Sequence, residues 1–244
     1  YSYFMLAQTF ARTYKGHENE PCCPIYTEPT VAGTQGNPRS SVEEVYKQIT
    51  ADITKAVELL NGTKQQHISH IGYAVALGLQ ARIALVMEDW ATAKTAAHAA
   101  ITASGCSVLA PSQFAGLNDS SAKNVIWGAE IIADQSGMYA SLFSHMDACD
   151  ETGDGAYGAS ARKQINKLLY DKMNSADERR SWWDPKNPEN GSNGYQQEKF
   201  KFADRQTWLG DYIWMRVEEM YLTAAEAECR LGEEPAAIED LTAV

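Results

Sequence analysis

Basic residues are scarce in this sequence of 244 residues, in which 21 Lys and Arg stand against 32 Asp and Glu for a formal net charge of −11. Such a charge repels phosphate backbones and anionic lipid headgroups, so it argues against a nucleic-acid partner and a polybasic membrane contact. Long apolar runs are also lacking. Stretches such as Val125 to Ala133 fall well short of the roughly 18 apolar residues that a transmembrane helix needs, so no membrane-spanning segment is expected.

Cysteine is also scarce. The sequence has five cysteines, which is an odd number, and they show no paired CxxC spacing. This pattern excludes a zinc finger and a disulfide framework, so we expect ordinary thiols. The sequence begins at Tyr1 instead of a methionine and stops three residues after the apolar Leu241. We therefore expect it to be a piece of a longer protein that continues at both ends.

Helical periodicity dominates the first half of the chain. Apolar residues recur at helical spacing from Tyr3 to Phe10 and predict a buried helix that ends near Lys15. A loop rich in Pro and Gly follows over residues 17–39. Ser41 and Glu44 then form a capping box, which predicts the start of a second helix.

Two further helices are predicted to form an antiparallel hairpin. Ser69 is expected to cap the first helix, and Asp89 the second, which runs from Trp90 to Ser104. Small residues on both helices allow their axes to approach closely: Ala74, Gly78, Ala81, Ala93, Ala97 and Ala100. With Leu77 and Gly78 in an L-G-x2-A pattern, the hairpin resembles a tetratricopeptide repeat.

The last part of the chain predicts a second hairpin of the same kind. Residues that repeat at steps of three and four run from Ile213 to Glu228 and are apolar up to Ala225; Gly232 closes this helix, and Pro235 begins another. Repeated helical hairpins indicate a mostly α fold, an α-solenoid. We expect one domain made of a helical region (1–123), a loop-rich, partly β ligand-binding region (124–210) and a truncated second hairpin (211–244).

The middle region lacks sustained periodicity. Residues 124–133 are apolar and β-branched, which predicts a short buried strand. A helix is predicted over 163–173 with its leucines facing inward, and residues 198–202 alternate like a short strand.

Catalytic and cofactor motifs occur only as fragments. Gly153, Gly155 and Gly158 match G-x-G-x-x-G, but neither a strand nor a helix flanks them and carboxylates surround them. An EF-hand-like start at Asp150 lacks the bidentate Glu at its twelfth position, where Ala161 stands. The segment 158–162 lacks the second glycine of a nucleophile elbow. We therefore expect no catalytic residues, no cofactor and no enzymatic activity.

Metal-ligand spacing is also lacking, since the histidines are scattered and only His67 and His70 are close in sequence. We expect no metal site from this pattern. A looser cation site formed by Asp147, Asp150 and Asp154 stays open beside the alternative of a solvated acidic loop.

The aromatic residues fall into two groups. Trp90, Trp127 and Trp214 lie in periodic elements and are expected in the core. The others lie in polar segments with Gly and Pro, where a ring can stack on the C–H face of a sugar: Tyr157, Trp182, Trp183, Tyr195 and Trp208. These five are the candidate ligand-binding residues. The alternative, that such rings only anchor their loops, stays open.

Short motifs follow one another in a characteristic order along almost the whole chain. They include Tyr3-Phe4-Met5-Leu6, Arg39-Ser40-Ser41, Ala81-Arg82, Asp89-Trp90, Val125-Ile126-Trp127 and the pattern M-R-x-x-E-M-Y-L-x-x-A-E-A over Met215–Ala227. This ordered set resembles the SusD/RagB family.

The resemblance implies an α-helical, tetratricopeptide-containing lipoprotein on the outer surface of the outer membrane of Gram-negative bacteria. It implies capture of an oligosaccharide or polysaccharide and its delivery to a SusC-like TonB-dependent transporter, with binding but no catalysis. The N-terminal lipid anchor it implies lies outside this sequence, and Cys22 and Cys23 are not that anchor. The alternative function is a tetratricopeptide-type scaffold that holds a protein partner and binds no glycan.

Overall fold

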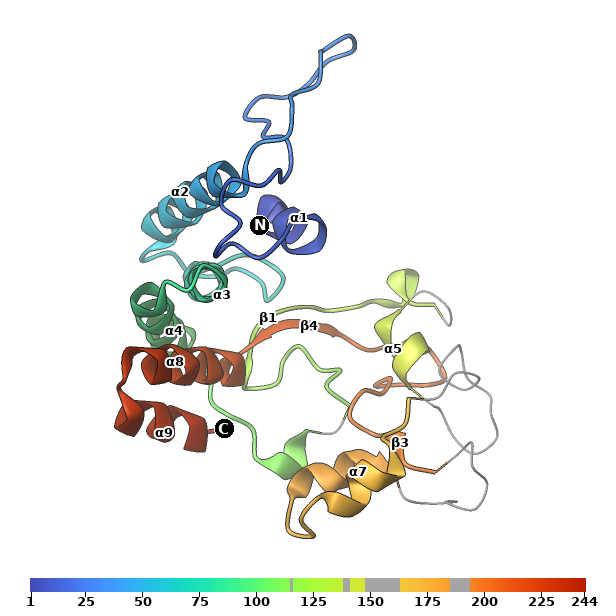
Figure 1. Ribbon diagram of the computed structural model, residues 1–244. Coiled ribbons are helices and arrows are strands. Elements are labelled where there is room, and N and C mark those ends of the chain that lie inside the picture. The colour runs from blue at the N-terminus through green and yellow to red at the C-terminus, as the bar shows by residue number, and fades with distance from the viewer. Residues whose placement is uncertain (115, 138–140, 148–162, 185–193) are drawn as a thin grey trace. The chain divides into compact units, whose positions relative to one another are not determined.

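The computed structural model describes residues 1–114, 116–137, 141–147, 163–184 and 194–244 (Figure 1). The chain divides into two compact units. The first unit contains Tyr1–Gln66, Ile71–Cys106 and Val217–Val244, and the second contains His67–His70 and Ser107–Arg216. Within the described residues, no helix is both long enough and apolar enough to span a bilayer. The expected division of the domain into three regions stays a prediction.

The first unit is helical. Its helices are α1 (Ser2–Phe10), α2 (Val42–Leu60), α3 (Tyr73–Val86), α4 (Trp90–Ser104), α8 (Val217–Leu231) and α9 (Glu234–Thr242). Each of these helices packs on the next, and α4 packs on α8 although a long stretch of chain separates them (Figure 1). The prediction of a mostly α fold with tetratricopeptide-like hairpins is confirmed.

Local capping signals fix several of these helix ends. The Glu44 N–H donates to Ser41 Oγ at 3.2 Å and the Ser41 N–H donates to Glu44 Oε2 at 2.8 Å, so the predicted capping box is present. Asp89 caps α4 by accepting a hydrogen bond from the Thr92 N–H at 3.2 Å. Gly105 ends α4 in the left-handed conformation (φ +63°), which favours glycine.

Two predicted helix ends are wrong. Ser69 does not cap α3, because that helix begins at Tyr73 behind Gly72. The Ser69 carbonyl instead accepts a hydrogen bond from Trp127 Nε1 at 3.1 Å, within the second unit. The first helix ends at Phe10 and not near Lys15, since apolar spacing lapses there and Ala11 takes an extended conformation (φ −119°, ψ 173°).

The small residues predicted for the hairpin are buried where α3 and α4 pack. Helix α3 is buried over most of its circumference, from Ala74 to Leu79, because α2, α4 and α8 all pack against it. Arg82 of α3 forms two hydrogen bonds with the Glu219 carboxylate of α8. Close packing of small side chains and one bidentate ion pair therefore join α3 to its neighbours.

Replacing Ala97 with leucine should lower the free energy of unfolding by roughly 1–3 kcal/mol, because overpacking a filled interior strains its neighbours. Ala97 is fully buried (0% exposed) on α4, whereas Ala103 on the same helix is exposed. Urea unfolding of Ala97→Leu and of the matched control Ala103→Leu measures the effect. Equal stability of the two variants would contradict this packing.

The second unit combines short strands with short helices. Its elements are η1 (Pro111–Gln113), β1 (Val125–Ala129), η2 (Ala133–Gln135), α5 (Leu142–Met146), α7 (Lys167–Lys172), η3 (Glu178–Trp182), β2 (Trp183–Asp184), β3 (Gln196–Gln197) and β4 (Tyr212–Arg216). Strand β1 pairs antiparallel with β4, and β2 pairs antiparallel with β3. The predicted strand at 124–133 and the partly β character of this region are confirmed.

Strand β4 corrects the prediction that the last long helix begins at Ile213. This segment is extended because it pairs with β1, and α8 begins only at Val217. The pairing is close at Gly128, where a Cβ atom would lie 2.7 Å from the Tyr212 carbonyl oxygen. Trp214 was expected in the core but is 42% exposed on β4, while Trp127 is buried as expected.

Two further predictions in this unit are wrong. Helix α7 buries Tyr170, whereas Leu168 and Leu169 are 72% and 57% exposed. The helix starts at the Asn166 cap and has only six residues, and the face that it buries is the one that carries Tyr170. Residues 198–202 are not a strand. The Gln197 side chain ends β3 by donating to the Phe200 carbonyl and accepting from the Phe200 N–H, both at 2.8 Å.

Candidate functional site

One cluster in the second unit joins aromatic rings with cationic side chains. We call it the Trp182 cluster, and it consists of Phe114, Trp182, Lys199 and Arg216. The Phe114 and Trp182 rings meet edge to face with centroids 6.0 Å apart. Lys199 Nζ lies 4.3 Å from the centroid of the Trp182 ring, and Arg216 Cζ lies 5.7 Å from that of Phe114. Each of the four residues is partly buried.

Local structure positions Trp182 at the junction of η3 and β2. Asp177 caps η3 by accepting a hydrogen bond from the Arg179 N–H at 3.0 Å. The Trp182 carbonyl accepts a hydrogen bond from the Glu198 N–H at 2.7 Å, beside the β2–β3 pair. Because that pairing also fixes the start of the segment after β3, Lys199 is brought next to the Trp182 ring.

The charges of this cluster are not balanced by carboxylates among the described residues, where neither Lys199 nor Arg216 forms an ion pair. Burial lowers the pKa of Lys199, and the positive charge of Arg216 lowers it further. Arg216 Nη1 is buried and has no hydrogen-bond partner in the part of the chain that the structure describes. The cluster therefore offers a ring face together with donors suited to hydroxyl or anionic groups.

The other predicted ligand-binding residues lie in two places within the same unit. Trp183 is part of β2, and Tyr195 precedes β3 with its ring 4.9 Å from that of Tyr170. The Trp208 ring packs separately, 5.3 Å from the Phe202 ring. These three rings and Trp182 are all partly buried. Tyr157 lies outside the described residues. Their role in ligand binding stays a prediction.

Trp214 is an exposed ring that the sequence analysis placed in the core. Its ring meets the buried Trp127 ring edge to face at 4.8 Å. The signal for this exposure is that Trp214 is followed by the buried Met215 in an extended strand, since successive side chains of a strand face opposite sides. Trp214 therefore offers an exposed aromatic ring in this unit.

Asp147 is one of the three acidic residues considered above for a cation site, and its carboxylate is already occupied by other partners. This side chain is buried, and its two oxygens lie 2.7 Å from Arg205 Nη2 and 3.0 Å from Arg205 Nε. The Phe202 N–H also donates to Asp147 at 3.0 Å. Arg205 and the backbone therefore satisfy this carboxylate. Asp150 and Asp154 lie outside the described residues.

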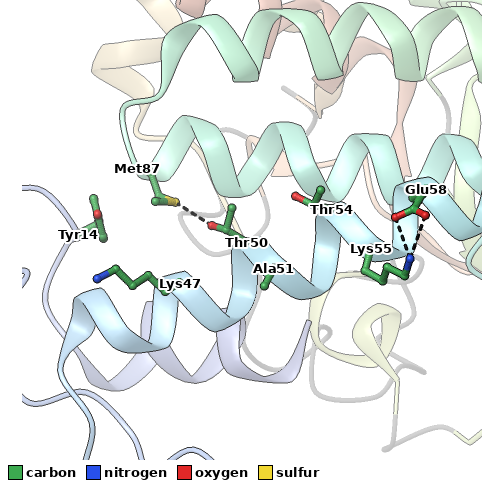
Figure 2. Close-up of a pocket in the computed structure, with 8 residues that line it drawn as sticks. All are labelled: Tyr14, Lys47, Thr50, Ala51, Thr54, Lys55, Glu58 and Met87. Atoms are coloured by element: carbon green, nitrogen blue, oxygen red, sulfur yellow. Dashed lines mark hydrogen bonds and ion pairs between the residues drawn. The ribbon is translucent and has the colours of Figure 1, made fainter.

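A cavity of about 540 Å³ lies along α2 in the first unit (Figure 2). It is lined by Tyr14, Lys47, Thr50, Ala51, Thr54, Lys55, Glu58 and Met87. Lys55 pairs with Glu58 at 2.9 Å, and Lys47 pairs with Glu43 at 3.0 Å. Since neighbouring carboxylates already neutralise both lysines, this cavity offers less to a charged ligand than the Trp182 cluster does.

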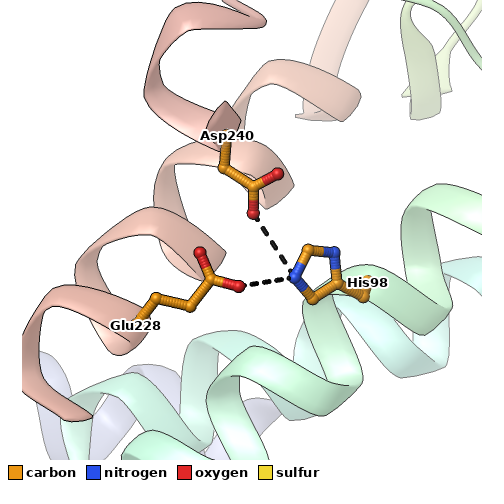
Figure 3. A group of neighbouring side chains, drawn as sticks. All are labelled: His98, Glu228 and Asp240. Carbon is orange, nitrogen blue, oxygen red and sulfur yellow. Dashed lines mark hydrogen bonds and ion pairs between the residues drawn. The ribbon is translucent and has the colours of Figure 1, made fainter. Parts of the chain in front are cut away.

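Three side chains that are remote in sequence meet in the first unit (Figure 3). His98 Nε2 lies 3.0 Å from Glu228 Oε1 and 3.3 Å from Asp240 Oδ2. Burial raises the pKa of Asp240, and the Glu228 and Glu239 carboxylates raise it further, against the opposing charge of His98. No sequence spacing could reveal this cluster, because its members lie on α4, α8 and α9.

This architecture is similar to that of SusD-like proteins of known structure. A SusD-like family model, described as starch-binding and associating with the outer membrane, matches residues 1–85. A SusD-like carbohydrate-binding protein from Bacteroides vulgatus is similar over 98% of this chain and 51% of its own, with 30% identity and a TM-score of 0.82. No curated protein matches the sequence.

Two more distant structures share the fold. A SusD superfamily protein from Bacteroides thetaiotaomicron is 20% identical with a TM-score of 0.73, over 99% of this chain and 55% of its own. Surface glycan-binding protein A from Bacteroides uniformis is 17% identical with a TM-score of 0.68, over 99% of this chain and 55% of its own. The chain thus spans about half the length of the solved structures that it matches.

Proposed function

Because the chain belongs to the SusD/RagB family, we propose that the protein binds an oligosaccharide or polysaccharide at the cell surface and delivers it to a SusC-like TonB-dependent transporter. The protein acts by binding and catalyses no reaction. The family model's description supports a location at the outer membrane, and the names of two similar structures support a glycan ligand. An N-terminal lipid anchor holds the protein there in this proposal.

The Trp182 cluster is the observation that carries the glycan proposal. A partly buried indole lies beside Lys199, and Arg216 lies over the neighbouring Phe114 ring; neither cation has a carboxylate partner among the described residues. This arrangement matches what a sugar presents: a C–H face and polar substituents. We propose Trp182 as the main stacking ring. Trp183, Tyr195, Trp208 and Tyr157 complete the proposed binding residues.

Affinity electrophoresis tests the proposed function. The intact protein is run through native gels that contain one polysaccharide each, drawn from plant, host and microbial sources, with a gel that lacks polysaccharide as the control. We expect retardation in at least one gel and no release of shorter sugars from that polymer. Normal migration in every gel would favour the scaffold for a protein partner, and release of sugars would indicate a glycoside hydrolase.

A further inference from the structure

The cluster of His98, Glu228 and Asp240 contains more negative charge than its neighbours compensate. Glu228 is 3% exposed and Asp240 is also buried. A single imidazole faces both carboxylates, and Glu239 adds negative charge nearby. When both carboxylates are ionised they carry two negative charges, which a single protonated imidazole cannot balance, and burial together with this excess raises the pKa of Asp240.

Two carboxylate oxygens of the cluster, Glu228 Oε2 and Asp240 Oδ2, are buried and have no hydrogen-bond partner among the described residues, although Asp240 Oδ2 lies 3.3 Å from His98 Nε2. The other Glu228 oxygen, Oε1, meets His98. Leaving a buried charged oxygen unsatisfied is costly, so such an atom usually marks a partner that the protein itself does not supply. Figure 3 shows one oxygen of each carboxylate directed at the same ring nitrogen of His98.

The spacing of the donor atoms fits a small metal ion. All three ligand atoms lie within 4.8 Å of one another, and the two distances from His98 Nε2 are 3.0 and 3.3 Å. In a tetrahedral zinc site with bonds of about 2.0–2.1 Å, neighbouring ligand atoms stand about 3.3 Å apart. The arrangement therefore needs little adjustment to hold such an ion.

We propose that His98, Glu228 and Asp240 bind a divalent transition-metal ion of the zinc type and so tie α4 to α8 and α9. One imidazole nitrogen with carboxylate oxygens suits Zn²⁺, whereas Ca²⁺ and Mg²⁺ prefer oxygen ligands alone. Two positive charges balance the two carboxylates while His98 stays neutral. The His98 side chain is 44% exposed, which gives the ion a path from solvent and leaves a coordination position for water.

Zinc titration of the purified, EDTA-treated protein tests this site. We expect the wild type to bind one equivalent of Zn²⁺ that His98→Gln and Asp240→Asn bind about a hundredfold more weakly, because each variant removes one of three ligands. His67→Gln is the matched control, since His67 is similarly exposed (48%) and its Nε2 also faces a carboxylate, that of Glu130, at 3.7 Å. The control should bind zinc like the wild type.

Two results would overturn the proposal: the wild type binds no equivalent of Zn²⁺, or His98→Gln binds Zn²⁺ as tightly as the wild type does. Circular dichroism of each variant shows whether it is folded. A second measurement uses the wild type alone. Co²⁺ is added to the EDTA-treated protein, and Co²⁺ bound in a four-coordinate site gives visible absorption that excess Zn²⁺ removes. Absence of that absorption in the wild type would equally contradict the site. The metal proposal is independent of glycan binding.

Discussion

Replacing Tyr46 with alanine should reduce the free energy of unfolding by about 3–5 kcal/mol, the largest loss of stability that we expect from one substitution. Tyr46 of α2 is 2% exposed, and its ring packs against Phe4 at 6.5 Å and Tyr14 at 5.0 Å between ring centroids. Removing the ring leaves a cavity where α1 meets α2. Urea unfolding followed by circular dichroism measures the loss.

Two comparison variants show how much of the lost stability comes from the ring itself, as opposed to its hydroxyl group or to any substitution on the same helix. Tyr46→Phe keeps the ring, so it should lose far less stability than Tyr46→Ala; burial raises the pKa of Tyr46, so its hydroxyl stays neutral at physiological pH. Leu59→Ala changes a residue that is exposed on the same helix and should have little effect. If Tyr46→Ala were as stable as Leu59→Ala, the packing of the Tyr46 ring in a core between α1 and α2 would be contradicted.

Replacing Trp182 with alanine should weaken glycan binding by at least tenfold, which corresponds to about 1.4 kcal/mol. The substitution removes the ring face and the contact that holds Lys199 Nζ at 4.3 Å from the ring centroid. The measurement is the retardation of Trp182→Ala in a gel containing the polysaccharide that retards the wild type, across a series of polymer concentrations.

Trp214→Ala is the matched control for this experiment, because it removes a different tryptophan of the second unit, one that is exposed. We expect it to bind the glycan like the wild type. Loss of binding in Trp214→Ala alone would move the site to β4. A Trp182→Ala protein that melts at a lower temperature but binds normally would show that the ring only anchors its loop.

Much of the first unit could be predicted from the sequence because its signals are local. The capping box at Ser41 and the left-handed Gly105 each depend on a few neighbouring residues, and the small residues of α3 and α4 follow one helical period. The ordered motifs along the chain also indicate the family by themselves. In the candidate site, the sequence could only mark aromatic rings in polar segments, since nothing local shows which rings meet.

Only the tertiary structure decided the features that depend on distant partners. The helical apolar pattern of the last long helix starts at Ile213, yet residues 212–216 are extended because β1 offers backbone hydrogen bonds to β4. Lys199 and Arg216 approach Trp182 and Phe114 only when four separate segments fold together. His98 meets Glu228 and Asp240 in the same way. Periodicity and capping determine the elements from nearby residues, whereas sites arise from contacts between residues whose separation carries no pattern.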